Sequence, residues 1–336
     1  MRSLTRSNGC ARISRMGSLA LLSTSLGLAI LSTGPTVHAQ LVITPTFDAS
    51  ITGASNAAAI EATINSAIAA YQTSFTNPIN VTINFQAMGS GLGQSNTTLY
   101  KLNYSTFINA LTANASSVDD ATALAHLPTG SINPVNSTST INVKTANIRA
   151  LGIAGSFPPI GGFDGTIGLN TGITDIGITG TTGQYSLFAV TEHEIDEVLG
   201  LGSDVAGTGF FADPAPEDLY RYTSGGARTF SNAVDDAYLS LDGTTDLARY
   251  NNVNNGGDYG DYHTGGTPQV QDAFATPGAH PVLGVELRSL DAIGYTRTAA
   301  IVATPEPSSF VMLGAGALAL SGYGLRRRKR AGKSAA

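Results

Sequence analysis

The two longest apolar stretches of the chain lie at its extreme ends, so its globular core has to come from the residues between them. These stretches are residues 16–31 and 310–325, and most of the basic residues cluster beside them. Residues 40–303 keep only 8 basic residues against 23 acidic ones, a net charge of −15. A body this acidic is repelled by a phosphate backbone, which argues against nucleic acid as a partner.

The N-terminal segment has the three parts of a secretory signal peptide. Basic residues come first, the apolar stretch follows, and Val37 and Ala39 then supply the small side chains that signal peptidase reads. We expect residues 1–39 to be removed. A transmembrane anchor is the alternative, but the cleavage site and the absence of charge after the apolar stretch favour the signal peptide. The sole cysteine, Cys10, would be lost with it, which excludes disulfides, thiol nucleophiles and cysteine metal sites.

The C-terminal segment also has three parts. Pro305, Glu306 and Pro307 precede the short apolar stretch, and an arginine-rich cluster follows at residues 326–330. This order resembles the PEP-CTERM sorting segment, over residues 304–336. The resemblance implies export, a transient membrane contact, processing by an exosortase, and a final location at the cell surface or in the extracellular matrix. An ordinary tail anchor is the alternative, and it too leaves the body outside the inner membrane.

The body is expected to be one α+β domain, residues 40–303, because no linker or repeat divides it. Apolar residues at helical spacing and alternating apolar residues mark its elements. Helices are predicted at residues 57–71, within 99–115 after Tyr104, at 185–199 and at 285–293, and strands at 80–85, 140–148 and 166–169. Residues 171–183 read as a loop, and most of residues 200–282 as irregular chain rich in Gly, Asp, Asn and Pro.

One short motif carries candidate chemistry, TEHEIDEVLGLG at residues 191–202. On a helix, His193 and Glu197 are four residues apart and share a face, so an imidazole nitrogen and a carboxylate oxygen can reach one metal ion. Glu194 lies about 100° around the helix, beside the metal, where its carboxylate could take a proton from a metal-bound water. The helical wheel directs Glu192 and Asp196 towards solvent.

Three segments together resemble one protein family. HEIDEVLG at residues 193–200, DLYRY at 218–222 and SLDAIGY at 289–295 resemble the HEIxE-type, zincin-like zinc metalloproteases, exported bacterial proteins with a PEP-CTERM segment. The resemblance implies a zincin- or metzincin-like single domain. It also implies an exported metallopeptidase that cleaves a peptide or protein substrate with Zn²⁺ as its cofactor.

The resemblance further implies roles for individual residues. His193 and Glu197 would bind Zn²⁺, and Glu194 would be the general base. In metzincin-like relatives a strand like the one at residues 165–170 precedes the active helix and forms the substrate-binding edge. For the third ligand there are three candidates. Asp218 is the first choice, because its separation along the sequence from His193 is similar to that at which thermolysin-like zincins place a carboxylate ligand. His263 and Asp204 are the alternatives.

A different class of function also fits the composition. A non-catalytic surface or matrix protein that binds divalent cations or polysaccharide would be equally acidic and rich in Gly, Asn and Thr. Residues 254–262, NNGGDYGDY, offer oxygen ligands of the kind that Ca²⁺ takes. Their spacing matches neither the EF-hand nor the GGxGxD repeat, so a surface loop is the simpler interpretation of this segment.

Overall fold

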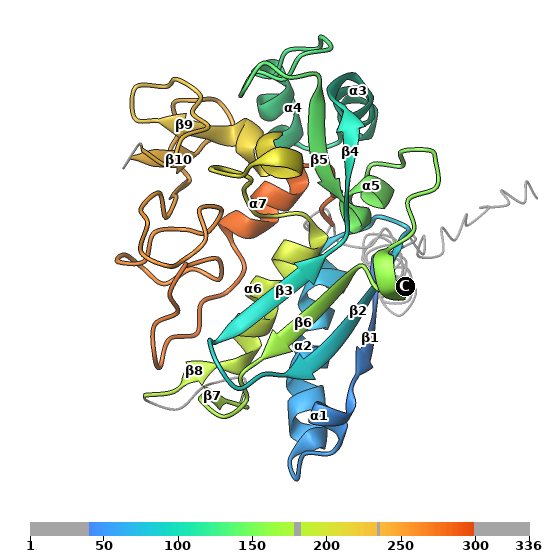
Figure 1. The fold of residues 1–336 in the computed structure, drawn as a ribbon, viewed down its shortest axis with the longest axis vertical. Coiled ribbons are helices and arrows are strands. Elements are labelled where there is room, and N and C mark those ends of the chain that lie inside the picture. Colours follow the sequence, from blue (N-terminus) through green and yellow to red (C-terminus); the bar gives the residue numbers. More distant parts are fainter. Residues whose placement is uncertain (1–39, 178–182, 234–235, 299–336) are drawn as a thin grey trace, which may run out of the picture. The chain divides into compact units, whose positions relative to one another are not determined.

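The computed structural model of the protein describes residues 40–177, 183–233 and 236–298 (Figure 1). The expected signal peptide and the expected sorting segment lie outside these residues. Within the described ranges, no helix has the length and apolar character needed to cross a membrane.

A four-stranded mixed sheet forms the base on which the candidate site is built. Its strand order is β1 (Val42–Phe47), β2 (Asn80–Ala87), β6 (Gly165–Leu169) and β3 (Gly93–Thr97). The first three strands are parallel and β3 runs antiparallel to β6. A short helix, α1 (Ala49–Thr52), follows β1. β3 is therefore one edge of the sheet and β6 is an interior strand.

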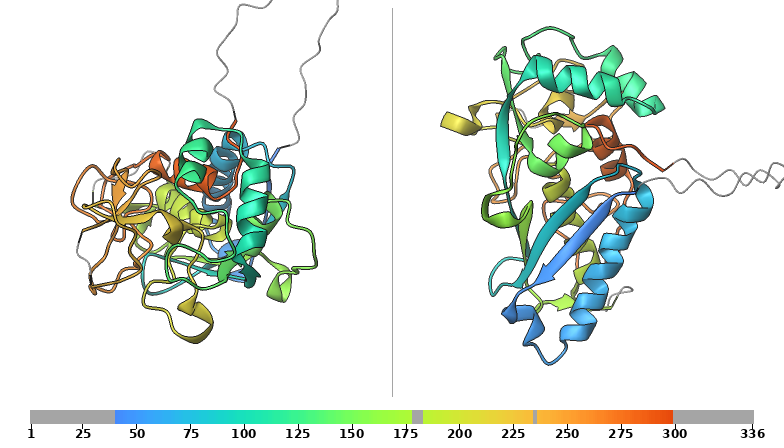
Figure 2. Two further views of the ribbon diagram at one scale, coloured as in Figure 1. Left: turned by 90° about the horizontal axis from the view of Figure 1, so that it is seen from above. Right: turned by 90° about the vertical axis from the view of Figure 1, so that its right-hand side faces the viewer.

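Two helices pack against each other and against this sheet, α2 (Ala57–Ser74) and α6 (Leu187–Leu199). The right-hand view of Figure 2 shows α2 running alongside the strands. Ile60, Ile64 and Ile68 recur at helical spacing and are buried, which is why this segment forms an amphipathic helix. In β2 the buried positions alternate, as expected for a strand with one face in the core. The predictions for both segments are confirmed.

A second layer of elements follows in the sequence. β4 (Leu99–Asn103) pairs with β5 (Thr140–Lys144), and α3 (Tyr104–Asn114), α4 (Val118–Ala125) and α5 (Thr145–Ala150) lie near them (Figure 1). The prediction of a strand over residues 140–148 is wrong in its second half. The partner strand begins at Leu99, opposite Lys144, and after one more backbone bond, from Thr145 N–H to Thr98 O, the chain turns into α5.

The C-terminal half has little regular structure. It holds a small sheet of β9 (Arg221–Thr223), β10 (Ala237–Leu239) and β11 (Ala248–Arg249), and the helix α7 (Val285–Ala292). The short strands β7 (Thr174–Asp175) and β8 (Tyr185–Ser186) pair just before α6, so the expected loop and the expected helix start each contain a strand. Short 3₁₀ turns occur at Ile160–Gly162, Gly209–Ala212 and Glu217–Tyr220.

Buried polar side chains hold these irregular segments together. Tyr220 donates a hydrogen bond to the carbonyl of Ala292, and Tyr295 to the carbonyl of Leu199 at the end of α6, both at 2.7 Å. Arg221 is fully buried, with its guanidinium 4.1 Å from the ring centre of Tyr250. The DLYRY and SLDAIGY segments thus have structural roles around α6. The chain has the α+β class that the sequence predicts.

Candidate metal centre

The local sequence fixes both ends of α6, the helix that carries the motif. The side chain of Ser186 accepts a hydrogen bond from the backbone N–H of Ala189 and caps the first turn. The helix ends at Gly200, whose φ of 151° is one that a residue with a side chain rarely adopts. A Cβ at Gly200 would also lie 2.7 Å from Ile293 Cδ1. The helix therefore stops within one turn of Glu197.

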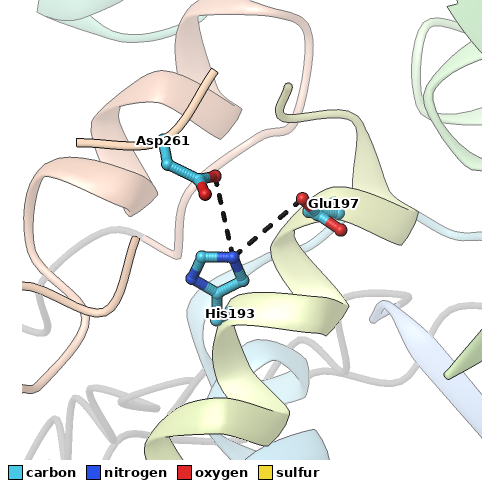
Figure 3. Close-up of side chains that lie close together, drawn as sticks. All are labelled: His193, Glu197 and Asp261. Atoms are coloured by element: carbon cyan, nitrogen blue, oxygen red, sulfur yellow. Dashed lines mark ion pairs between the residues drawn. The ribbon is translucent and has the colours of Figure 1, made fainter. Parts of the chain in front are cut away.

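The side chains of His193 and Glu197 meet a third from a distant segment, Asp261 (Figure 3). His193 Nε2 lies 3.6 Å from Asp261 Oδ1 and 4.0 Å from Glu197 Oε1. One nitrogen and two oxygen ligand atoms thus lie within 4.8 Å of one another. Ligands held about 2.1 Å from one tetrahedral ion are about 3.4 Å apart. Both distances from His193 Nε2 are therefore only slightly longer than two ligands of one ion require.

Each of the three side chains is oriented by a further hydrogen bond. Nδ1 of His193 lies 3.0 Å from the carbonyl of Val270, which keeps Nδ1 protonated and directs Nε2 at the cluster. Ser95 Oγ donates to Glu197 Oε2 at 2.5 Å. Gln271 Nε2 donates to Asp261 Oδ1 at 3.1 Å. Such outer contacts are typical of metal sites, where they fix the direction of the ligands.

The electrostatics of the cluster favour a bound cation. Burial lowers the pKa of His193, but the negative charges of Asp261, Glu194 and Glu197 outweigh it and raise the pKa to about 10. Burial raises the pKa of Asp261 to about 7, although the charge of His193 opposes it. In the metal-free chain protons held by Glu194 and Asp261 offset part of the negative charge, and a divalent ion would take the place of those protons. The residues present fit zinc, which takes imidazole nitrogen and carboxylate oxygen.

Glu194 lies beside the cluster, where the sequence predicts a general base. Burial first, and then the charge of Glu197, raise its pKa to about 9. Its carboxylate fits closely against the edge strand, because a Cβ added at Gly93 would fall 2.3 Å from Glu194 Oε1. Glycine at this position therefore makes room for the carboxylate.

The cluster lies at the junction of two hollows. A cleft of about 680 Å³ is bordered by the start of β3, the first half of α6 and the loops of residues 256–281. Ile173 and Phe274 give it an apolar wall. A second, more polar hollow of about 350 Å³ includes Lys144 and Asp204. Ser95, Glu197 and Asp258 line both, so the cluster is accessible from two sides.

None of the three residues considered as the third ligand is part of the cluster. Asp218 is fully buried and accepts hydrogen bonds from Ser203 Oγ and from the backbone N–H groups of Asp204 and Ala215. Its carboxylate therefore organises a turn. The side chain of Asp204 accepts a hydrogen bond from Asn142 Nδ2 at 2.8 Å, and His263 is exposed. The carboxylate that the structure does bring to His193 and Glu197 is that of Asp261.

Asp261 is in the run NNGGDYGDY, which was interpreted as a surface loop. Its neighbour Tyr262 is completely buried, and the backbone N–H of Tyr262 donates to the carbonyl of Gln271 at 2.7 Å. This anchor turns Asp261 towards α6. The sequence does hint that this polar segment is anchored, because Asp261 stands beside the aromatic Tyr262. Nothing in the local sequence, however, indicates which helix or strand the segment contacts.

The expectation that Glu192 and Asp196 point to solvent is wrong. Their side chains are 2% and 0% exposed, and ten of the 13 residues of α6 are buried. The helical wheel assumes one packed face, whereas α2, α5, α7 and the sheet all contact α6. Burial, reinforced by the charge of Glu286, raises the pKa of Glu192 to about 8 and that of Asp196 well above its ordinary value.

The expected substrate-binding edge is also misplaced. Residues 165–169 form β6, which pairs with β2 on one side and β3 on the other. The free edge next to the motif belongs to β3. The backbone bonds Asn170 N–H to Leu92 O and Thr98 N–H to Asp164 O show that even-numbered positions bond to β6. The backbone groups of Gly93, Ser95 and Thr97 are thus directed away from β6.

Comparison with known proteins identifies the C-terminal segment. Residues 303–329 match the PEP-CTERM protein-sorting motif. The chain is an exported, exosortase-sorted protein. Its destination is the cell surface or the extracellular matrix, as the sequence predicts. None of the curated proteins and none of the solved structures compared with this exosortase-sorted chain is significantly similar to it.

Proposed function

We propose that this protein is an exported zinc-dependent metallopeptidase of zincin-like type. The observation that carries the proposal is the convergence of His193, Glu197 and Asp261, from two distant segments, on one point at the floor of the cleft, with Glu194 beside them. A bound Zn²⁺ would supply Lewis-acid polarisation of the scissile carbonyl. His193, Glu197 and Asp261 would hold the ion, in place of the set ending in Asp218.

The remaining chemistry falls to the chain's own side chains. With a cation at the cluster, the pKa of Glu194 would fall from about 9, and the ionised carboxylate would then take the proton of the attacking water and pass it to the leaving amine. Ser95 and Gln271 would keep the two carboxylates in position through their hydrogen bonds. The close fit of Glu194 against Gly93 supports this role, because it restricts the carboxylate to the side of the cleft.

The edge strand supports a peptide as substrate. The outward backbone groups of Gly93 and Ser95 are the kind of edge to which an extended peptide adds as a further strand. The cleft beside that edge carries an apolar wall with Val190 and Phe274. The charged residue types that line it outside the cluster are all acidic, namely Glu194, Asp258 and Asp272. A side chain of the peptide would pack against these apolar residues while the backbone of the peptide pairs with β3.

The test is the metal content and the peptidase activity of the full chain. We expect about one zinc per chain by elemental analysis, lost in both His193→Ala and Asp261→Asn and retained in the control His263→Ala. Glu194→Gln should retain the zinc and lose cleavage of a peptide library by at least about 100-fold. Cleavage at the wild-type rate in Glu194→Gln would overturn its role as general base.

A different result would favour the other class of function. A wild-type chain that holds no zinc, cleaves nothing and binds several Ca²⁺ ions loosely would be an acidic surface or matrix protein. The net charge of −15 on residues 40–303 suits that outcome. Loss of zinc in His263→Ala together with its retention in Asp261→Asn would instead disprove the proposed ligand set.

A further inference from the structure

The side-chain amide of Gln271 lies next to the candidate metal site but is not one of its three proposed ligands. The residue is 0% exposed. Its Nε2 is 3.1 Å from Asp261 Oδ1 and 3.4 Å from His193 Nε2. Its Oε1 is buried and has no hydrogen-bond partner among the described residues. A buried amide oxygen without a partner costs free energy, so this arrangement is incomplete.

The direction of the amide matters once a cation is considered. His193 donates its Nδ1 proton to Val270, so Nε2 faces the cluster and offers its lone pair once a cation displaces the Nε2 proton. A cation on that lone pair would face the N–H hydrogens of Gln271, which carry partial positive charge. The two ends of an amide have nearly the same shape, so a half-turn exchanges the nitrogen for the oxygen without new space.

The distances suit a ligand atom at the amide position. Two ligand atoms of one tetrahedral zinc ion are about 3.4 Å apart. The cluster-facing amide atom of Gln271 is 3.1 and 3.4 Å from the ligand atoms of Asp261 and His193. The amide is therefore about as far from each as two ligands of the same ion would be.

We propose that Gln271 is a fourth protein ligand, binding the ion of this site through Oε1 after its amide has turned. This inference rests on the proposed metal site of His193, Glu197 and Asp261. Gln271 is not among the residues that line the cleft, so it approaches the site from the buried side. With four protein ligands, substrate would bind as a fifth ligand from the side of the cleft, an expansion that catalytic zinc sites allow. The donor set then has one nitrogen and three oxygens, which shifts its preference towards harder ions such as Mn²⁺.

The test is calorimetric titration of Zn²⁺ into the metal-free full chain. Gln271→Met keeps the size of the side chain but has no amide oxygen, and we expect it to weaken zinc binding at least tenfold. Gln271→Glu restores an oxygen and removes the N–H donor, so it should bind zinc as tightly as the wild type or more tightly. Gln184→Glu, the same change at an exposed position, is the control and should match the wild type.

The variant Gln271→Glu distinguishes a role of Gln271 as a metal ligand from a role as a hydrogen-bond donor only. If Gln271 served only to donate to Asp261, Gln271→Glu would place two carboxylates together and lose as much affinity as Gln271→Met. That result would overturn the proposal. The visible absorption of the Co²⁺-loaded protein gives a second readout, since it reports coordination number, and it should change in Gln271→Met.

The outcomes also separate this proposal from the metal site itself. Unchanged zinc affinity and an unchanged Co²⁺ spectrum in Gln271→Met would reject Gln271 as a ligand and leave the other three in place. A wild-type chain that binds no stoichiometric metal would reject both. Thermal unfolding of each metal-free variant shows whether it folds. If Gln271→Met does not fold, the comparison of Gln271→Glu with the wild type decides the matter.

Discussion

At the scale of single residues, the site depends on side chains that the sequence motif does not contain. Ser95 comes from the edge strand, and its hydroxyl donates to the Glu197 oxygen that does not face His193. Without this bond the carboxylate of Glu197 could rotate away from the position in which it faces His193. In the proposed site Ser95 would therefore position the ligand Glu197 without binding the ion itself.

Ser95→Ala tests this role. We expect zinc affinity to fall about tenfold, the lower end of the effect seen when an outer-shell partner is removed. The measurement is calorimetric titration of the metal-free chain, with Ser90→Ala, an exposed position just before the strand, as the matched control. Equal affinities in the two variants would show that the Ser95 hydroxyl does not orient Glu197.

The sequence predicts the local part of the site and misses the rest. His193, Glu194 and Glu197 could be grouped because helical periodicity converts spacing along the chain into proximity in space. Asp261 and Gln271 reach the same point only through the burial of Tyr262 and its bond to the Gln271 backbone. No periodicity connects those positions, so spacing rules borrowed from other zincins directed the search to Asp218.

At the scale of elements, the same contrast holds. The predictions of α2 and β2 are correct because each has its own apolar pattern, while β3, with the sequence GQSNT, has none and was not predicted. β3 exists because β6 offers it a partner and α6 covers one of its faces. The polar edge strand is nevertheless the element that borders both hollows and contacts Glu194 and Glu197.

Gly93→Ala tests the fit between β3 and α6. The new methyl group would lie 2.3 Å from Glu194 Oε1 and 2.8 Å from a methyl of Val190, so Glu194 has to move. A displacement of about 1 Å costs a catalytic group on the order of 100-fold in rate. We expect kcat for peptide cleavage to fall by that factor with bound zinc retained.

The control for this change is Gly89→Ala, where an added Cβ meets nothing within 4 Å. Full activity in the control together with a lost rate in Gly93→Ala would assign the effect to the contact with Glu194. A Gly93→Ala chain as active as the wild type would mean that the carboxylate is not held by the edge strand.

At the scale of the whole molecule, the chain buries acidic groups in its core as well as displaying them on its surface. Burial raises the pKa of Glu192 and of Glu217 to about 8, and those of Asp204 and Asp291 to about 6. The pKa of Asp242 is shifted the other way, lowered by hydrogen bonds from the backbone N–H groups of Thr245 and Thr244. More of these carboxyl groups have a raised pKa than a lowered one, so the raised ones determine how folding stability changes as pH rises.

The sign of the pH dependence follows from these shifts. A carboxyl group with a raised pKa binds its proton more tightly in the folded chain, so folding loses stability as pH rises from about 4.5, the unfolded value, to about 8. The raised pKa of His193 adds to this loss: its stabilising contribution is complete below pH 6.5, the unfolded value, and is lost progressively as pH rises to about 10. Below about pH 4 the lowered pKa of Asp242 destabilises the fold. The metal-free chain should therefore be most stable near pH 4 and lose stability steadily above it.

Urea unfolding in EDTA at pH 5, 6.5 and 8 measures this dependence. The free energy of unfolding should decline across the series, by up to about 1.4 kcal/mol per pH unit for each proton released. Glu217→Gln should make the decline shallower, and Glu61→Gln, half-exposed on α2, should leave it unchanged. A free energy of unfolding that rises from pH 5 to pH 8 would mean that these carboxyl groups are paired with positive charge in the folded chain. Adding Zn²⁺ at pH 8 should restore part of the lost stability, because an ion at His193, Glu197 and Asp261 stabilises their metal-binding forms.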